Sequence, residues 1–398
     1  MKKLLFFAIS AFMLISCQNE KLNDFSKVVP EVPEVSAQII PGKYVVVYNN
    51  TGVKRAARIA SLSGNAVIST ENVVALTKEV LASSNIEMRT PSFTYASALK
   101  GVAIELTDAE AVELAKSPAV KGVYPDMMVN FGLPVAVVTG KPTTPVAQSI
   151  PWGITRIGGS TSGLGKTAWI IDTGIDMNHP DLNVSQTKGK NFVTTGALPE
   201  DDNGHGTHCA GIVGALNNNL GVIGVAAGAT VVPIKVLNRR GSGAYSAIIA
   251  GVNYVSDNAQ PGDAVNMSLG GPIYTPLDVA ILAMAAKGIK VALAAGNESQ
   301  NANNVSPAHI NGTNIYTISA MGTGDLWASY SNFGNPPVDY CAPGSGIYST
   351  YKGDTYATLS GTSMATPHVC GILLLGTLKA DGYVSGDNDG RPDPIAHN

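Results

Sequence analysis

The sequence is poor in charged residues, and this shortage narrows the class of protein. Only 14% of its 398 residues are Asp, Glu, Lys or Arg, and the formal net charge of −3 gives no basic surface for nucleic acid. A hydrophobic content of 45% excludes an intrinsically disordered protein. The 43 glycines and 23 prolines exclude a long coiled coil. What remains is a compact, glycine-rich globular protein with room for two or three domains.

The apolar run at the N-terminus, residues 4–15, is too short for a membrane span. It follows two lysines, as in a secretory signal peptide. It ends at Ser16-Cys17, which resembles the bacterial lipobox, in which the Cys is acylated. A plain signal peptide with a chance Cys is the alternative. We therefore expect residues 1–17 to be a lipoprotein signal peptide. The protein would be exported, with its precursor lipid-anchored at the cell envelope and membrane contact through this N-terminus alone.

Cysteine is also scarce. Beyond the signal peptide only Cys209, Cys341 and Cys370 remain. Three thiols form at most one disulfide, so the chain is not a disulfide-rich scaffold. The sequence leaves open whether Cys341 or Cys370 forms a disulfide.

The N-terminal third divides into three parts. Residues 18–39 read as a tether that contains two prolines and has no usable periodicity. Residues 40–130 read as a small α+β domain without His or Cys, in which Thr107 and Glu110 form a possible helix capping box. Residues 131–146 read as a linker of prolines and small residues.

From residue 147 to 398, apolar strands alternate with helical stretches. This alternation predicts an α/β fold with a mostly parallel central sheet that is covered by helices on both faces, which accounts for part of the low charge. Ligands of such sheets bind beyond the carboxyl ends of the strands. The expected strands are 168–171, 231–237, 264–269 and 290–295, and the expected helices are 242–257, 276–287 and 363–379.

Three short motifs carry residues suited to nucleophilic catalysis. Asp172 ends an apolar strand, His205 stands between two glycines, and Ser363 follows Gly-Thr at the start of a helix. A serine hydroxyl needs an imidazole to take its proton, and the imidazole needs an acid to fix its tautomer. Taken singly, the motifs could be a turn, a metal site with His208, and a helix cap. Taken together, they have the chain order Asp, His, Ser, which is the order of subtilisin.

With these motifs the chain resembles the subtilisin-like serine proteases over about residues 147–370. Residues 147–153 resemble the mature N-terminus of subtilisin, and residues 40–130 loosely resemble the inhibitory propeptide of the family. The resemblance implies that Ser363 is the nucleophile, His205 the general base and Asp172 its orienter. Asn297, which follows Ala-Ala-Gly after a strand, would donate to the oxyanion.

The resemblance also implies a substrate groove in which an extended peptide pairs with backbone edges. The groove residues fall in three segments, and Tyr245 would shape a distant apolar subsite. They are Ser242, Gly243 and Tyr245; Ser268, Leu269, Gly270 and Gly271; and Ala294, Ala295 and Gly296.

A structural Ca²⁺ site is implied as well, at an Asn-rich loop. Its ligands would be the side chains of Gln148, Asp181 and Asn218 and the carbonyls of Leu216, Leu220 and Val222. Asp387, Asp389 and Asp393 near the C-terminus also have the alternating spacing of cation ligands, although we favour a solvated acidic tail there.

Only residues 381–398 follow the last helix, so the catalytic unit is expected to be trimmed at this end.

The expected function is a secreted serine endopeptidase that acts through an acyl-enzyme and is made as a self-processing zymogen. Its partners would be peptide or protein substrates and its own propeptide, which serves as chaperone and inhibitor, and we expect a monomer. Self-cleavage is expected in the 131–146 linker, just before Ala147. Cys209 is expected to be a buried thiol rather than a nucleophile. Two alternatives are a catalytically inactive subtilase-fold binding module and a metal hydrolase built on His205, His208 and Asp172.

Overall fold

The computed structural model describes most of the chain beyond the expected signal peptide. The described residues are 35–49, 52, 69–134, 136–139 and 146–398. The lipobox and most of the tether lie outside these ranges. Within them, no helix is long and apolar enough to cross a membrane.

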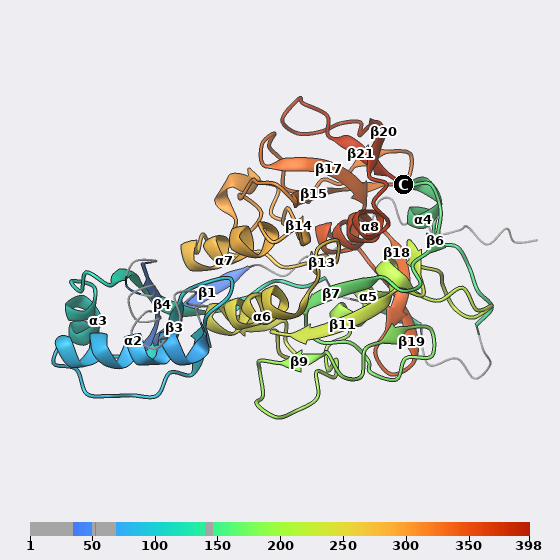
Figure 1. Cartoon of the computed structure of the whole chain (residues 1–398). Coiled ribbons are helices and arrows are strands. Elements are labelled where there is room, and N and C mark those ends of the chain that lie inside the picture. Colours follow the sequence, from blue (N-terminus) through green and yellow to red (C-terminus); the bar gives the residue numbers. More distant parts are fainter. Residues whose placement is uncertain (1–34, 50–51, 53–68, 135, 140–145) are drawn as a thin grey trace, which may run out of the picture.

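An eleven-stranded, mostly parallel sheet forms the centre of the larger domain (Figure 1). Neighbouring strands from β21 to β8 pair in parallel, as the alternation of strands and helices predicted. The strand order is β20 (Lys379–Tyr383), β21 (Pro394–His397), β17 (Val338–Pro343), β15 (Ile315–Gly322), β14 (Lys290–Ala294), β13 (Ala264–Met267), β7 (Thr167–Asp172), β11 (Thr230–Lys235) and β8 (Asn183–Val184), with β16 (Leu326–Trp327) beside β15 and β9 (Lys190–Asn191) beside β11.

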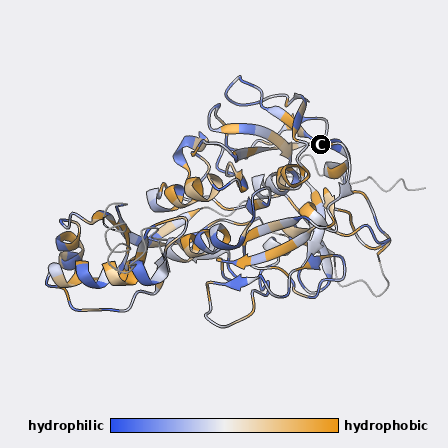
Figure 2. Cartoon of the chain, viewed as in Figure 1, coloured by the Kyte–Doolittle hydropathy of each residue, from blue (hydrophilic) through white to orange (hydrophobic). Residues whose placement is uncertain are grey.

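Helices cover both faces of this sheet. On β7, Ala168 and Ile170 lie in one buried cluster with residues of α5 (His205–Gly214) and α8 (Thr362–Leu375). Trp169 and Ile171 lie in a second cluster with residues of α6 (Tyr245–Asn258) and α7 (Thr275–Ala285). Side chains of a strand alternate between faces, so a strand buried on both sides is apolar throughout. Figure 2 shows hydrophobic residues along these central strands, and this burial explains part of the low charge.

The described part of the N-terminal domain is a small antiparallel sheet with two helices, in line with the expected α+β domain. It contains β1 (Ser36–Tyr48), β2 (Phe93–Tyr95), β3 (Gly101–Glu105), β4 (Val120–Asn130), α2 (Thr70–Ser83) and α3 (Asp108–Leu114). The predicted capping box of α3 is confirmed. The Thr107 hydroxyl accepts from the Glu110 N–H at 3.2 Å, and the Glu110 carboxylate accepts from the Thr107 N–H at 2.7 Å. Helix α2 carried no signal that we recognised in the sequence.

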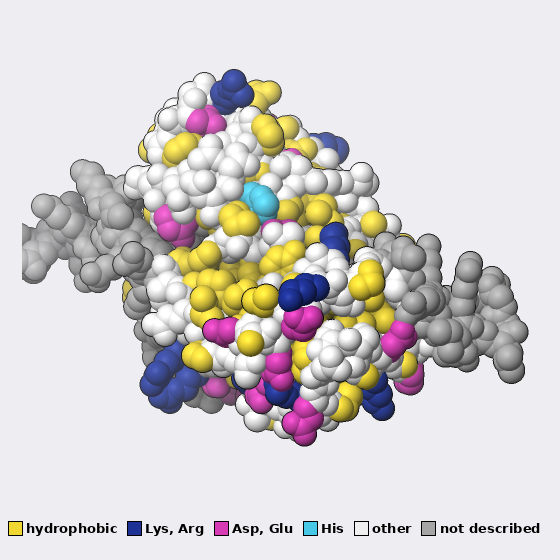
Figure 3. Space-filling view, turned by 90° about the vertical axis from the view of Figure 1, so that its left-hand side faces the viewer, with side chains coloured by type: hydrophobic (Ala, Val, Ile, Leu, Met, Phe, Trp, Pro, Cys, Tyr) yellow, Lys and Arg dark blue, Asp and Glu magenta, His cyan; other side chains and the backbone are white. Residues whose placement is uncertain are grey.

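This N-terminal domain docks on α6 of the larger domain. Val46 on β1 packs in the domain's own core, whereas Val45 faces the cluster that contains α6. The buried Asp126 on β4 accepts from the hydroxyl and the N–H of Ser246 at 2.5 and 3.0 Å, and the Tyr95 hydroxyl donates to the Ser246 carbonyl at 2.9 Å. Figure 3 faces this end of the molecule, where apolar side chains gather across the middle and charged ones are interspersed.

Several element boundaries differ from the sequence predictions. Residues 242–244 form a strand, β12, rather than the start of α6, because they pair with β4 of the N-terminal domain. Helix α8 ends at Leu375 rather than near residue 379, because Gly376 adopts a positive φ of 81°. Residues 36–39, assigned to the tether, belong to β1. Within the expected linker, β5 (Val137–Thr139) pairs with β19 (Thr355–Leu359).

The C-terminal residues are not a solvated tail, so that prediction was wrong. Strands β20 and β21 form an antiparallel hairpin, and β21 joins the central sheet beside β17. Asp393 and Ile395 are buried. A final pair of strands therefore closes this edge of the sheet, in place of the trimmed end that the sequence suggested.

Candidate active site

Asp172 stands at the carboxyl end of β7, where the fold predicts a ligand site. Its side chain is fully buried. One carboxylate oxygen accepts from the Thr173 N–H at 2.7 Å, which holds the side chain in place beside α5. A buried carboxylate held in this way presents its charge to the imidazole opposite.

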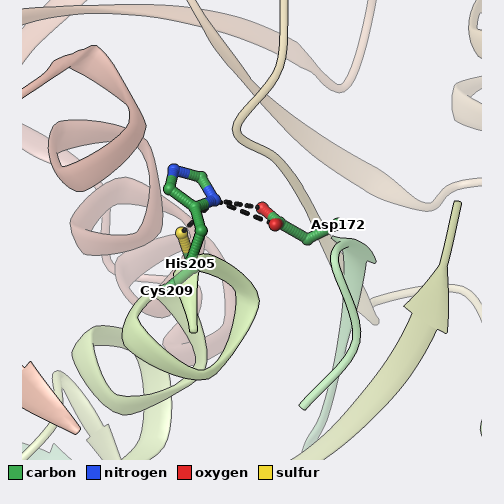
Figure 4. Close-up of side chains that lie close together, drawn as sticks. All are labelled: Asp172, His205 and Cys209. Atoms are coloured by element: carbon green, nitrogen blue, oxygen red, sulfur yellow. Dashed lines mark hydrogen bonds and ion pairs between the residues drawn. The ribbon is translucent and has the colours of Figure 1, made fainter. Parts of the chain in front are cut away.

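His205 is the first residue of α5 and faces Asp172 (Figure 4). Its Nδ1 lies 2.9 and 3.0 Å from the two Asp172 oxygens. Burial disfavours the charged ring, but the charge and hydrogen bond of Asp172, together with the Cys209 sulfur, raise the pKa of His205 above its ordinary value. A Cβ at Gly206 would lie 2.1 Å from the Gly174 carbonyl, so only glycine lets α5 approach β7 this closely.

Ser363 is the second residue of α8, so its N–H stands among the unpaired donors of the helix N-terminus. Its hydroxyl donates to the Ser268 carbonyl at 3.3 Å, and its own carbonyl accepts from the Ser268 hydroxyl at 2.8 Å. The buried Nε2 of His205 has no hydrogen-bond partner. The structure therefore places the three residues at one site with the Asp-His bond made and the His-Ser bond not made.

Asn297 follows β14 and is oriented by the start of α8. Its side-chain oxygen accepts from the N–H and the hydroxyl of Thr362 at 2.8 and 3.0 Å. With the oxygen so engaged, the amide N–H₂ is directed away from Thr362. This nitrogen lies 3.6 Å from the position a Cβ would take on Gly361, two residues before Ser363.

The N-terminal domain lies against part of the expected groove. Ser242 and Gly243 of β12 pair with Asn130 and Val129 of β4. A Cβ added to Gly271 would lie 2.8 Å from the Tyr245 hydroxyl and 3.0 Å from the Val129 side chain. Val129 therefore fills the space beside Tyr245. Ser268, Leu269, Ala294 and Ala295 are all buried next to this edge, and Gly270 and Gly296 have no room for a side chain because Val305 and Asn332 lie there.

Two supporting residues, Asp201 and Asn332, were not predicted from the sequence. Asp201 accepts from the Thr173 and Thr207 hydroxyls at 2.8 and 2.6 Å and so ties the end of β7 to α5. Asn332 holds the turn that carries Asn297, through bonds to the Ala295 carbonyl and the Glu298 N–H. Asp201 lies four residues before His205, which could have drawn attention to it. Asn332 acts only through tertiary contact.

The three described cysteines are buried and unpaired. Cys209 lies under the site, with its sulfur 4.0 Å from His205 Nδ1 and 3.5 Å from the Ser363 carbonyl. Burial raises the pKa of the Cys209 thiol, so it stays protonated. Cys209 is therefore a buried thiol beside the site, as expected. Cys341 and Cys370 form no disulfide in the structure.

The geometry does not support a metal centre on His208. Its Nε2 lies 3.0 and 3.1 Å from the carbonyls of Ile347 and Ala357, away from Asp172. Burial lowers the pKa of His208 to about 3, so the ring is neutral. The Nε2 of His208 is engaged by these carbonyls, while its buried Nδ1 has no hydrogen-bond partner. Because His208 is turned to the backbone and not to the other two residues, the metal-hydrolase interpretation loses one of its three ligands.

The expected calcium ligands do come together. The Gln148 amide lies 2.7 and 3.2 Å from the carbonyls of Leu216 and Val222. Asp181 is fully buried, and its Oδ1 has no partner. Burial raises the pKa of Asp181 to about 6. An orphaned carboxylate oxygen beside two carbonyls is a donor set that suits Ca²⁺. Asn218 and Leu220 lie on the same loop, where the Asn218 side chain accepts from the Leu220 N–H.

Comparison with known proteins decides the family. A sequence model of the subtilase family matches residues 167–384, and a model of the peptidase inhibitor I9 matches residues 43–131. The chain belongs to the subtilase family. It is a subtilisin-like serine endopeptidase made as a zymogen, and the I9 domain is its propeptide.

The sequences of related proteins are similar to this one along most of the chain. An extracellular serine proteinase of Thermus sp. (strain Rt41A) is 33% identical over 384 residues, which span 93% of this chain and 88% of that protein. Thermitase of Thermoactinomyces vulgaris is 42% identical over 222 residues, which span 55% of this chain and 77% of that protein. The crystal structure of a cold adapted subtilisin-like serine proteinase matches with a TM-score of 0.56 and 36% identity, covering 62% of this chain and 97% of that one. This subtilase therefore has the α/β subtilisin fold behind an α+β propeptide.

Proposed function

We propose that Ser363 is the nucleophile of this peptidase, His205 its general base and Asp172 the residue that orients His205. The observation that carries the proposal is the pair of 2.9 and 3.0 Å contacts from His205 Nδ1 to Asp172. They require Nδ1 to hold a proton, which leaves Nε2 free to accept one. The Ser363 hydroxyl turns from the Ser268 carbonyl toward Nε2, loses its proton there and attacks the peptide carbonyl. His205 then returns the proton to the leaving amine, and water hydrolyses the acyl-enzyme.

This proposal is tested by peptide hydrolysis with the processed enzyme. A fluorophosphonate should abolish hydrolysis, whereas a chelator added just before the assay should not. Inhibition by the chelator at once, with fluorophosphonate resistance, would favour metal chemistry. No hydrolysis and no labelling would favour the inactive binding module.

Asn297 is proposed to donate to the oxyanion together with the Ser363 N–H. Asn297→Ala is expected to lower kcat by about 10²–10³-fold with little change in KM, because the donor acts on charge that develops in the transition state. Asn297→Asp keeps an acceptor for Thr362 but loses the donor, so it should be equally impaired. Asn303→Ala, an exposed asparagine nearby, is the control. A kcat near that of the wild type for Asn297→Asp would contradict the role.

Substrates are proposed to bind as an extended strand on β12 and on residues 268–271. The support is β4 itself, which lies there in an antiparallel pairing. Val129 occupies the space beside Tyr245, so an apolar residue is expected at the matching position of good substrates. The inhibitory role of the propeptide follows from the same contact, since β4 and a substrate compete for one edge.

We propose that the subtilase cleaves itself within the 131–146 linker. The Pro134 ring lies 3.0 Å from a Cβ position on Gly361, close to Ser363, whereas Ala147 pairs with Leu220 at the calcium loop. This arrangement favours a cut shortly after Phe131 over one directly before Ala147. N-terminal sequencing of the active form should give a start between residues 132 and 147, and Ser363→Ala should stay uncut. A start before residue 130 would contradict the proposal.

Lipid attachment at Cys17 is proposed from the lipobox alone. Cleavage in the linker would then release the catalytic domain from its anchor. Detergent partitioning of the uncut Ser363→Ala protein, with and without Cys17→Ser, tests the anchor. Partitioning that does not depend on Cys17 would contradict it.

A structural Ca²⁺ is proposed at Gln148, Asp181, Asn218 and the three loop carbonyls. When bound, the ion would neutralise Asp181 and hold residues 147–149 on the loop. Saturating Ca²⁺, at about 100 times its Kd, should raise the Tm by about 5–10 °C over chelator. Asp181→Asn should shrink this difference, and the exposed-loop control Asn217→Ala should keep it. An undiminished Ca²⁺ effect in Asp181→Asn would contradict the site.

A further inference from the structure

We propose that the loop of residues 385–393 is a second calcium site, independent of the protease chemistry and of the loop at residues 216–222. It joins β20 to β21 at the far edge of the sheet. Counted from Ser385, the third, fifth and ninth residues are Asp387, Asp389 and Asp393, and the sixth is Gly390. Oxygen ligands at alternate positions, with glycine at the sixth for a sharp turn, are the pattern of an EF-hand calcium loop.

The backbone of the loop turns where the pattern places its glycine. Gly390 has a positive φ of 72°. The Asp389 carboxylate accepts from the Arg391 N–H at 2.8 Å, and an Asp387 oxygen accepts from the Asp389 N–H at 3.3 Å. These bonds hold the Asp387 and Asp389 carboxylates against the backbone of the loop. Strand β21 follows directly, so no glutamate takes the last position of the EF-hand pattern.

The evidence that points to a ligand is a set of buried oxygens with no partner. Asp393 is only 1% exposed; its Oδ2 accepts from the Ser319 hydroxyl at 2.5 Å, and its Oδ1 has no partner. Asp387 Oδ2 is also buried and unpartnered. Oδ1 of Asn335, in the segment before β17, is buried and unpartnered as well. The amide N–H₂ of Asn335 donates to the Arg391 carbonyl at 2.8 Å, which places this side chain at the loop. A buried carboxylate oxygen without a partner is unfavourable, and a cation bound at these oxygens would compensate them.

The charges nearby do not supply that compensation. Within the described part of the chain, no ion pair involves Asp387, Asp389 or Asp393. The Arg391 guanidinium instead donates to the Asn335 carbonyl at 3.3 Å. A divalent cation would offset two of the three negative charges of these carboxylates.

The donor set favours Ca²⁺ over smaller ions. Carboxylate and amide oxygens are hard ligands, and the flexible coordination of Ca²⁺ tolerates such a mixed set, whereas Mg²⁺ demands near-ideal octahedral geometry. The carboxylates of the loop are not yet close together. Among the described residues, only Asp172, His205 and Cys209 form a group of three His, Cys, Asp or Glu side chains with all ligand atoms within 4.8 Å of one another. The three carboxylates of the loop must therefore draw together when the ion binds. An affinity on the order of 10⁻⁴–10⁻³ M, typical of extracellular modules, is expected.

Terbium luminescence tests the site in the inactive full chain, Ser363→Ala. Tb³⁺ is a luminescent probe of calcium sites. Trp327 lies beside the loop, because its backbone N–H donates to the Ser385 carbonyl at 2.9 Å and its side chain packs near Val384. Tryptophan excitation should sensitise Tb³⁺ emission that Ca²⁺ displaces and equimolar Mg²⁺ does not. The double variant Asp387→Asn/Asp389→Asn should lose this emission and weaken the corresponding Ca²⁺ affinity at least about tenfold.

Controls separate this site from the first and from misfolding. Asp381→Asn removes an exposed acid from the same hairpin and should leave the emission intact, as should Asp181→Asn at the other loop. Trp327→Phe should lower the emission but keep Ca²⁺ binding in calorimetry. Unchanged calorimetric stoichiometry in the double variant, equal loss in Asp381→Asn, or equal displacement by Mg²⁺ would each overturn the proposal. None of these outcomes bears on the protease function.

Discussion

Replacing Ser363 by Ala should lower kcat on a peptide substrate by about 10⁶-fold, the loss seen when the nucleophile of subtilisin is removed. The reason is that no other group at the site can form the acyl-enzyme. The Cys209 thiol is buried, its burial raises its pKa, and it faces the Ser363 carbonyl rather than the groove. Hydrolysis of a fluorogenic peptide by processed enzyme measures the effect; for the inactive variant, the propeptide must be removed in trans.

The double variant Ser363→Ala/His205→Ala is the control for this prediction. His205→Ala should cost about as much as Ser363→Ala, and the pair together should cost little more, because the two residues act as one unit. The residual rate should remain about 10³–10⁴-fold above the uncatalysed reaction, supported by Asn297 and substrate binding. Losses that multiply in the double variant would mean that Ser363 and His205 act separately.

Asp172→Asn should lower kcat by about 10⁴-fold and also move the pH profile. His205 must be neutral to accept the serine proton, so activity exists above the pKa of His205 and is lost as the pH falls through it. Asp172 raises that pKa against the effect of burial. Removing its charge should therefore shift the acid limb of kcat/KM to lower pH, although the remaining rate is small. A full pH profile with processed enzyme measures both effects.

Asp202→Asn is the matched control, since Asp202 lies at the same end of the sheet and pairs with Lys235 at 2.6 Å without touching His205. It should leave the acid limb where it is. An Asp172→Asn profile that keeps the wild-type acid limb, or moves it to higher pH, would show that Asp172 does not control the charge of His205.

The sequence predicted the parallel sheet and the position of the site for a physical reason. Buried strands are continuously apolar, so their ends can be read, and carboxyl ends of parallel strands share one edge. The sequence therefore placed Asp172 and Asn297 at the ends of strands, where they lie in the structure. The glycines beside His205 and before Ser363 marked close approaches that the structure contains. The contact of His205 Nδ1 with Asp172 also indicates which ring nitrogen holds the proton, and no sequence pattern contains that information.

What the sequence could not predict depends on contacts between distant segments. Strand β12 exists because β4 lies beside it, and β21 exists because β17 offers an open edge; both are too short to be recognised by their own composition. The acidic C-terminal residues read as solvated because nothing in their spacing reveals that Asp393 is buried under Ser319. Asn332 supports Asn297 from a loop 35 residues further along the chain, as the sequence numbering shows. Such pairings are set by tertiary packing rather than by local propensity.

The most direct test of the account is to react the processed enzyme with a fluorophosphonate and locate the adduct by peptide mass spectrometry. We expect one adduct per molecule, on Ser363, which disappears in Ser363→Ala and is greatly slowed in His205→Ala. The propeptide-bound form should react slowly, because β4 covers the groove. An adduct on another residue, or equal labelling of Ser363→Ala, would contradict the assignment of the nucleophile.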